Sequence, residues 1–180
     1  MNSVNNNPQN IKIICLTGMM GVGKTTIGKK LAEILDYYYF DSDVEISDYA
    51  KKNIAQIFED HGEKYFRKLE KDIVTNLVQR KEKMVISLGG GVFINDKIRK
   101  ILLENSTVIW LDANLETIMS RTKNSKDRPT LTNSPNKRKF LSDLLVKRNK
   151  IYKEANIKID VNINDCKKIL DNIITKLNLL

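Results

Sequence analysis

Short apolar runs alternate with amphipathic stretches along most of the chain. Residues 11–17 read IKIICLT and residues 84–88 read MVISL. Both runs are brief, contain β-branched residues and are followed by glycine, a pattern that favours buried strands over helices. By this criterion we predict strands at residues 11–17, 37–40, 84–88, 108–111 and 157–161, with the first of them at the centre of a sheet.

Apolar residues between these runs recur at helical spacing. Residues 63–80, for example, place Phe66, Leu69, Ile73 and Leu77 on one helical face. Strands that alternate with helices imply a parallel sheet covered on both faces, so we predict an α/β fold of three layers. The predicted helices are 25–35, 43–50, 54–60, 63–80, 96–103, 115–121, 140–154 and 165–180, the last begun by Asp165.

The chain has 180 residues, of which 41% are hydrophobic, and this suffices for one domain with a buried core. We expect residues 11–180 to form that domain and the Asn-rich residues 1–10 to be a disordered polar extension. A membrane span needs about 20 apolar residues, and the sequence offers neither such a stretch nor a signal peptide. We therefore expect a cytoplasmic protein.

The formal charge of +9 raises the question of a nucleic-acid or membrane partner. The lysines are spread through the predicted helices instead of forming one block, so we expect neither partner, and we expect a monomer. The two cysteines, Cys15 and Cys166, have no cysteine or histidine neighbours at metal-binding spacing. We interpret both as free thiols.

The clearest chemical motif is a phosphate loop. Residues 18–25, GMMGVGKT, match G-x-x-x-x-G-K-[ST] between a predicted strand and a predicted helix. In such a loop, backbone amides and the helix N-terminus bind phosphate oxygens. Lys24 would reach the β and γ phosphates, and Thr25 would offer its hydroxyl to Mg²⁺. A regulatory GTPase would also need a base-reading Asn-Lys-x-Asp motif, and the NKRK at residues 136–139 does not match it.

Two carboxylates, Asp41 and Asp43, directly follow the second predicted strand. Ligands of parallel sheets bind at the carboxyl ends of strands, so one carboxylate could face a metal and the other an acceptor hydroxyl. Alternatively, Asp43 only caps the helix that follows.

The order of motifs resembles that of the shikimate kinase family over nearly the whole chain after residue 10. The similar segments are GMMGVGKTTIGKKLA, FDSD, IFEDHGEKYFRKLE, SLGGGV, RTKNSKDRPTL and LVKRNKIYKEA. The resemblance implies a P-loop kinase fold and transfer of the γ-phosphoryl of ATP, with Mg²⁺, to the 3-hydroxyl of shikimate. That reaction belongs to the pathway to chorismate and the aromatic amino acids.

The resemblance also implies a role for each site residue. Asp43 would contact the shikimate hydroxyls as the base, and Asp41 and Thr25 would support Mg²⁺. Arg67 and Arg148 would hold the shikimate carboxylate beside the backbone of Gly89, Gly90 and Gly91, with Phe58 and Phe66 as walls. The catalytic set would be Asp43, Lys24 and Arg128. ATP would bind to Gly21, Val22, Gly23, Lys24, Thr25, Thr26, Arg121 and Arg128, with Arg128 carried by a lid at about residues 123–136.

Several alternatives stay open at this level. Arg67 could be a surface residue paired with Glu63 or Glu70 at helical spacing. The sequence also departs from the family: Thr130 replaces a usual leucine, and residues 161–166 lack an arginine for adenine. The strand before the glycine triplet ends without an acidic residue, which leaves metal support to Asp41. Rival functions are another small-metabolite kinase, such as a gluconate kinase, and a nucleotide-binding module without catalysis.

Overall fold

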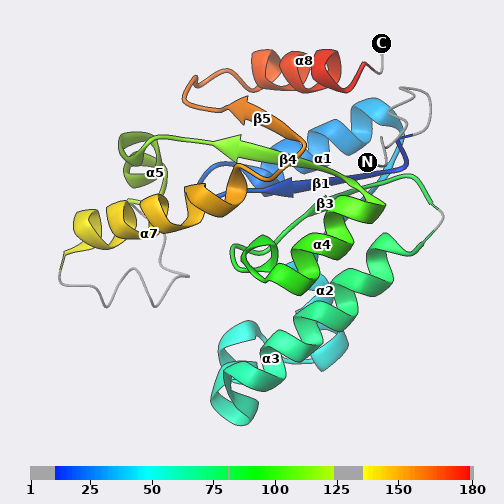
Figure 1. The fold of residues 1–180 in the computed structure, drawn as a ribbon, viewed down its shortest axis with the longest axis vertical. Coiled ribbons are helices and arrows are strands. Elements are labelled where there is room, and N and C mark those ends of the chain that lie inside the picture. The colour runs from blue at the N-terminus through cyan, green and yellow to red at the C-terminus, as the bar shows by residue number, and fades with distance from the viewer. Residues whose placement is uncertain (1–10, 81, 124–135, 179–180) are drawn as a thin grey trace.

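A five-stranded parallel sheet forms the centre of the molecule in the computed structural model, which describes residues 11–80, 82–123 and 136–178 (Figure 1). The strand order is β2-β3-β1-β4-β5. The strands are β2 (Tyr38–Asp41), β3 (Met84–Ser87), β1 (Ile13–Thr17), β4 (Thr107–Asp112) and β5 (Ile157–Asp160). The predicted α/β class and the central position of the first strand are confirmed.

Every residue of β1 and β3 is buried. When helices cover both faces of a parallel sheet, its strands are buried on both sides. This explains why the sequences of these strands are continuous apolar runs. Ile13 lies opposite Met84 in β3, and Ile14 lies opposite Thr107 in β4. The carboxyl ends of the three strands therefore lie at one edge of the sheet.

Helices cover the sheet on two sides, as predicted. Figure 1 shows α1 (Lys24–Leu35) and α8 (Cys166–Leu177) on one side of the sheet and α4 (Asp96–Asn105) on the other. The remaining elements are α2 (Ser42–Ala50), α3 (Ile54–Val78), a short 3₁₀ turn η2 (Val92–Ile94), α5 (Leu115–Arg121) and α7 (Lys137–Tyr152). Of these, α2 packs on α3, which packs on α4, and α7 packs on α5 and η2.

Local capping explains most helix boundaries. Asn53 begins α3 with a reciprocal capping box to Gln56. This cap lies between the predicted helices 43–50 and 54–60. The predicted helices 54–60 and 63–80 form the single element α3, but Gly62 interrupts it with φ 76° and ψ 174°. Asp165 accepts a hydrogen bond from the backbone N–H of Lys168 and so begins α8, as predicted.

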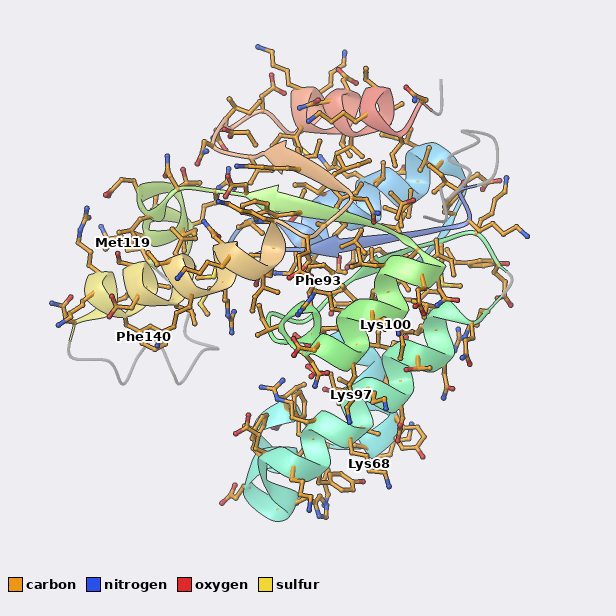
Figure 2. All side chains as sticks on the ribbon, viewed as in Figure 1. Lys68, Phe93, Lys97, Lys100, Met119 and Phe140 are labelled. Carbon is orange, nitrogen blue, oxygen red and sulfur yellow. The ribbon has the colours of Figure 1, made fainter. Side chains whose placement is uncertain are left out.

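The surface carries basic residues on several elements. Figure 2 shows Lys68 on α3 and Lys97 and Lys100 on α4, and all three are exposed. Within residues 11–80, 82–123 and 136–178, no helix combines the length and the apolar character that a membrane crossing requires.

Cys15 and Cys166 are free thiols, and burial raises the pKa of Cys15 to about 12. The extension at residues 1–10 and most of the lid, 124–135, lie outside the described residues.

Candidate active site

The phosphate loop lies between the carboxyl end of β1 and the start of α1. Gly18, Gly21 and Gly23 have φ values of 140°, 77° and 96°, which side chains with a Cβ rarely adopt. A Cβ on Gly21 would also lie 2.7 Å from the side chain of Thr122. The Nζ of Lys24 donates hydrogen bonds of 3.0 Å to the carbonyls of Gly18 and of Met19, so the loop curls around the ammonium group.

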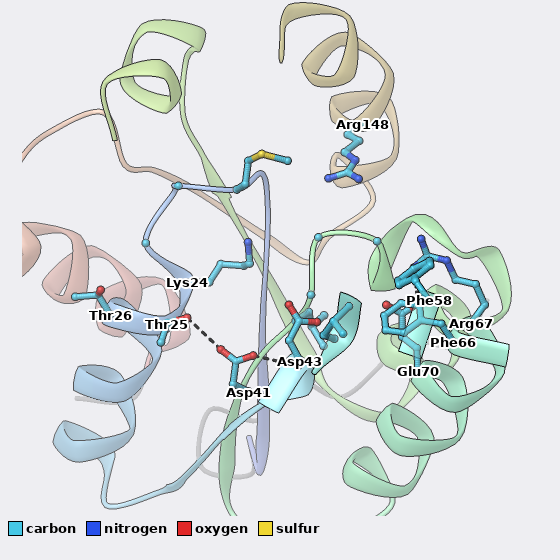
Figure 3. Close-up of a pocket in the computed structure, with 18 residues that line it drawn as sticks. Lys24, Thr25, Thr26, Asp41, Asp43, Phe58, Phe66, Arg67, Glu70 and Arg148 are labelled. Atoms are coloured by element: carbon cyan, nitrogen blue, oxygen red, sulfur yellow. Dashed lines mark hydrogen bonds and ion pairs between the residues drawn. The ribbon is translucent and has the colours of Figure 1, made fainter. Parts of the chain in front are cut away.

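A cavity of about 650 Å³ extends from this loop toward α3 and α7. It gathers residues of the phosphate loop, the acidic segment, α3, the glycine triplet and α7. Figure 3 shows Asp43 between Lys24 and Thr25 on one side and Arg67 on the other, with Arg148 entering from its own helix. The sequence-predicted residues that line the cavity are Gly21, Gly23, Lys24, Thr25, Thr26, Asp41, Asp43, Phe58, Phe66, Arg67, Gly89, Gly90, Gly91 and Arg148.

Asp41 connects the phosphate loop to α2. Its Oδ2 accepts a hydrogen bond of 3.1 Å from the hydroxyl of Thr25, and its Oδ1 accepts one of 3.1 Å from the backbone N–H of Asp43 (Figure 3). Asp41 is therefore the N-cap of α2, and the alternative that Asp43 serves as this cap is wrong. The exposed Asp43 side chain lines the cavity instead.

Each glycine of the triplet faces one charged side chain. A Cβ on Gly89 would overlap Oδ1 of Asp43, and one on Gly91 would lie 2.7 Å from Nη1 of Arg67. A Cβ on Gly90 would lie 3.1 Å from Nη1 of Arg148. The triplet is thus the surface on which the three predicted substrate-binding side chains rest.

Arg67 makes the ion pairs that its helical spacing allows and also lines the cavity. It bonds to Glu63 at 3.3 Å and to Glu70 at 2.9 Å. The two proposals for this residue, helix pairing and a place in the site, are therefore compatible. Glu63 is exposed, whereas the Glu70 side chain is 2% exposed and lines the cavity.

Glu70 and Ser42 are site residues that the sequence analysis missed. Burial raises the pKa of Glu70 above its ordinary value, although Arg67 acts to lower it. The buried Ser42 hydroxyl accepts a hydrogen bond of 2.8 Å from the N–H of Gly89 and so fixes the triplet to the acidic segment. For Glu70, the available signal was its position three residues after Arg67. For Ser42, the sequence carries no such signal.

Other predicted residues have different positions. Phe58 and Phe66 line the cavity as predicted, and their rings pack at a tilt with centroids 4.5 Å apart; Phe66 also belongs to a small core cluster. Val22 is buried and, like Arg121, is absent from the described cavity lining. The Arg121 guanidinium donates instead to the carbonyls of Val22, Val161 and Ile163. Arg128 lies outside the described residues.

The residues beside Lys24 fit a magnesium ion that also binds nucleotide phosphates. Mg²⁺ prefers oxygen ligands, retains several waters and takes few ligands from the protein. The Thr25 hydroxyl and the Asp41 carboxylate, which are hydrogen-bonded to each other, offer such oxygens. In the described part of the chain, no group of three or more acidic, cysteine or histidine side chains forms a separate metal cluster. A metal held mainly through phosphates is consistent with both observations.

A phosphate loop at the carboxyl edge of a parallel sheet, open to a cavity that carries acidic and basic side chains, defines the chain as a P-loop kinase. The family model described as "Shikimate kinase" matches residues 20–178. The chain belongs to the shikimate kinase family, and it is an ATP-dependent kinase.

Individual relatives agree with this membership. A shikimate kinase of Persephonella marina is 40% identical over 164 residues, which cover 91% of this chain and 98% of that protein. The structure of shikimate kinase from Acinetobacter baumannii in complex with shikimate has a TM-score of 0.87 at 34% identity, and the match covers 94% of each chain. A gluconokinase from Sinorhizobium meliloti shares the fold, with a TM-score of 0.60 at 14% identity and coverage of 92% of this chain and 90% of that one.

Proposed function

We propose that this chain transfers the γ-phosphoryl group of ATP to the 3-hydroxyl of shikimate, giving shikimate 3-phosphate and ADP on the way to chorismate. The observation that carries the proposal is a cavity that joins the phosphate loop to two arginines, with a carboxylate between them. Shikimate has a carboxylate and ring hydroxyls. The two arginines can bind the carboxylate, and Asp43 can bind a hydroxyl. The solved relative from Acinetobacter baumannii, which holds shikimate, supports the same assignment.

The arginines would orient the acceptor. A guanidinium matches a carboxylate in bidentate geometry, and two of them from different elements, α3 and α7, would fix the ring. Arg67 is held by Glu70, and Arg148 rests against Gly90. Arginines held in this way would align the shikimate hydroxyl with the γ-phosphorus of ATP, so that the reaction of two bound molecules becomes effectively unimolecular.

Asp43 would accept the proton of the attacking hydroxyl. The hydroxyl oxygen then forms a bond to the γ-phosphorus, the bond from that phosphorus to the β–γ bridging oxygen breaks, and ADP leaves with the electron pair. Negative charge that spreads over the transferred group would be stabilised by Lys24, whose ammonium lies inside the phosphate loop. Mg²⁺, held by Thr25 and supported by Asp41, would neutralise phosphate charge.

A substrate panel tests this function. ADP release with Mg·ATP would be measured with shikimate, quinate, gluconate or no acceptor, and we expect release with shikimate alone. ADP release that depends on gluconate would favour a gluconate kinase, and release that needs no acceptor would contradict both kinase functions.

Asp43→Asn should lower kcat by about 100-fold or more while ATP still binds, since acid–base assistance contributes about 10²–10⁴-fold. Normal turnover of this variant would exclude Asp43 as the base.

The remaining roles are proposals of the same kind. Arg128, on the lid at about residues 123–136, would reach the transferred phosphoryl, and closure would exclude water. Arg121 would contribute to the nucleotide side, where it already bonds to the phosphate-loop carbonyl of Val22. The monomeric state, the cytoplasmic location and the single domain at residues 11–180 stay predictions.

A further inference from the structure

Tyr152, the last residue of α7, is a buried polar group that the proposed mechanism does not use. Its relative exposure is 0%, and it is among the largest fully buried side chains. Its ring stacks with Phe93 at 6.4 Å and packs at a tilt on Trp110 at 6.0 Å, between centroids. Figure 2 shows Phe93 beside the C-terminal end of α7. These aromatic contacts leave the ring little freedom to move.

The hydroxyl of Tyr152 donates a hydrogen bond of 3.3 Å to the carbonyl of Gly90. Buried hydroxyls nearly always have a partner, because an unsatisfied one costs free energy. Gly90 is the central member of the triplet that lines the cavity. The bond therefore ties the end of α7 to the floor of the acceptor site, 62 residues away in sequence.

Arg148 lies one helical turn before Tyr152, so the two side chains share a face of α7. The guanidinium contacts the same glycine from the cavity side, 3.1 Å from the position of a Gly90 Cβ. Burial raises the pKa of Tyr152, and the positive charge of Arg148 acts to lower it.

We propose that Tyr152 is a positioning residue for acceptor binding: its hydroxyl fixes the Gly90 peptide and, through it, the Arg148 guanidinium in the orientation that receives a carboxylate. The inference rests on the proposed function of Arg148. Phe93 and Trp110 fix the orientation of the Tyr152 ring, and the ring fixes the position of its hydroxyl. The hydroxyl in turn holds the Gly90 peptide, against which Arg148 packs.

Tyr152→Phe is the variant that tests this role, since it removes the hydroxyl and keeps the ring. We expect the KM for shikimate to rise about 3- to 10-fold, the usual worth of one neutral hydrogen bond. The KM for ATP and kcat should stay within about twofold of wild type, which a general loss of structure would not achieve. The matched control is Tyr37→Phe, which also removes a hydroxyl bonded to a backbone carbonyl, that of Ile11 at 2.7 Å, away from the cavity.

Two outcomes would overturn the inference: an unchanged shikimate KM in Tyr152→Phe, or an equal rise in Tyr37→Phe. Arg148→Ala separates this inference from the function on which it rests. If Arg148→Ala leaves the shikimate KM unchanged, the assignment of the carboxylate site itself is wrong. If Arg148→Ala raises KM and Tyr152→Phe does not, only the positioning role fails.

The double variant tests the route of the effect. In the Arg148→Ala background, adding Tyr152→Phe should change KM by less than about twofold, because groups that act through one another are not additive. A full additive effect would contradict positioning through Arg148. Thermal unfolding of each variant confirms that the measured protein is folded.

Discussion

Arg67 and Gly91 are so close that a Cβ on the glycine would lie 2.7 Å from Nη1 of the arginine. The same Nη1 donates the 2.9 Å bond to Glu70. Gly91 has φ −103° and ψ −15°, which is a negative-φ conformation open to residues with a Cβ and not the left-handed region that favours glycine. The glycine is therefore required here by the neighbouring side chain and not by the backbone.

Gly91→Ala should displace Arg67 without unfolding the protein. We expect the shikimate KM to rise about 10- to 100-fold, because misplacement by about 1 Å has costs of this order. The melting temperature should change little, since the flexible guanidinium can move. Steady-state kinetics with each substrate varied would measure this, and the ATP KM should hold.

The Arg67→Ala background supplies the control for Gly91→Ala. Once the guanidinium is absent, the extra methyl group has nothing to displace and should add less than about twofold to the shikimate KM. A large additional rise would show that Gly91 acts through another contact.

Glu70→Gln should weaken acceptor binding through Arg67. Hydrogen bonds to charged groups contribute about 1.5–3 kcal/mol, and Glu63 retains part of the pairing, so we expect a rise in shikimate KM of about 5- to 20-fold. Glu63→Gln is the matched control, because its side chain is 70% exposed and surface ion pairs contribute little. Equal effects of the two variants would contradict a special role for the buried carboxylate.

The pKa of Glu70 predicts a pH dependence of stability. Burial raises this pKa in the folded state above the ordinary 4.5, so the folded protein binds more protons than the unfolded chain. The resulting stabilisation is complete below the unfolded pKa and is lost as the pH rises through the folded one. The melting temperature of wild type minus that of Glu70→Gln should therefore fall as the pH rises from about 4.5 to 8.

Thermal unfolding of both proteins by circular dichroism across this range is the measurement, with Glu63→Gln run in parallel. A difference that stays constant or grows with pH would mean that pairing with Arg67 outweighs burial for Glu70.

Asp41→Asn should raise the Mg²⁺ requirement. Its carboxylate accepts a hydrogen bond from the Thr25 hydroxyl. Loss of a group that orients a metal ligand typically lowers metal affinity by about 10- to 100-fold. Calorimetry should show weaker binding of Mg·ADP and unchanged binding of ADP in the presence of EDTA. Asp43→Asn is the contrast, since it should lower kcat with no change in Mg²⁺ dependence. Unchanged Mg·ADP binding by Asp41→Asn would remove Asp41 from the metal site.

Much of the fold could be read from the sequence because the informative residues are local. Each buried strand is a short apolar run, and Asn53 and Asp165 are caps that a single helical turn explains. The phosphate loop is equally local, since its glycines, Lys24 and Thr25 are within eight consecutive residues.

The division of labour between Asp41 and Asp43 was harder to predict. Both follow the same strand, and either could have capped α2. The choice depends on where Thr25 and Gly89 lie in space: Asp41 bonds to Thr25, while Asp43 rests against Gly89. These neighbours come from separate segments.

The sequence by itself determined the order of strands and helices, the phosphate loop and, through its resemblance to a family, the candidate site residues. Only the tertiary structure decided how they meet: the Ser42–Gly89 bond joins residues 47 apart, and the Tyr152–Gly90 bond joins residues 62 apart. The physical reason is range. Apolar periodicity and capping act over one or two turns, whereas the cavity exists only where the parallel sheet brings the ends of distant strands to one edge.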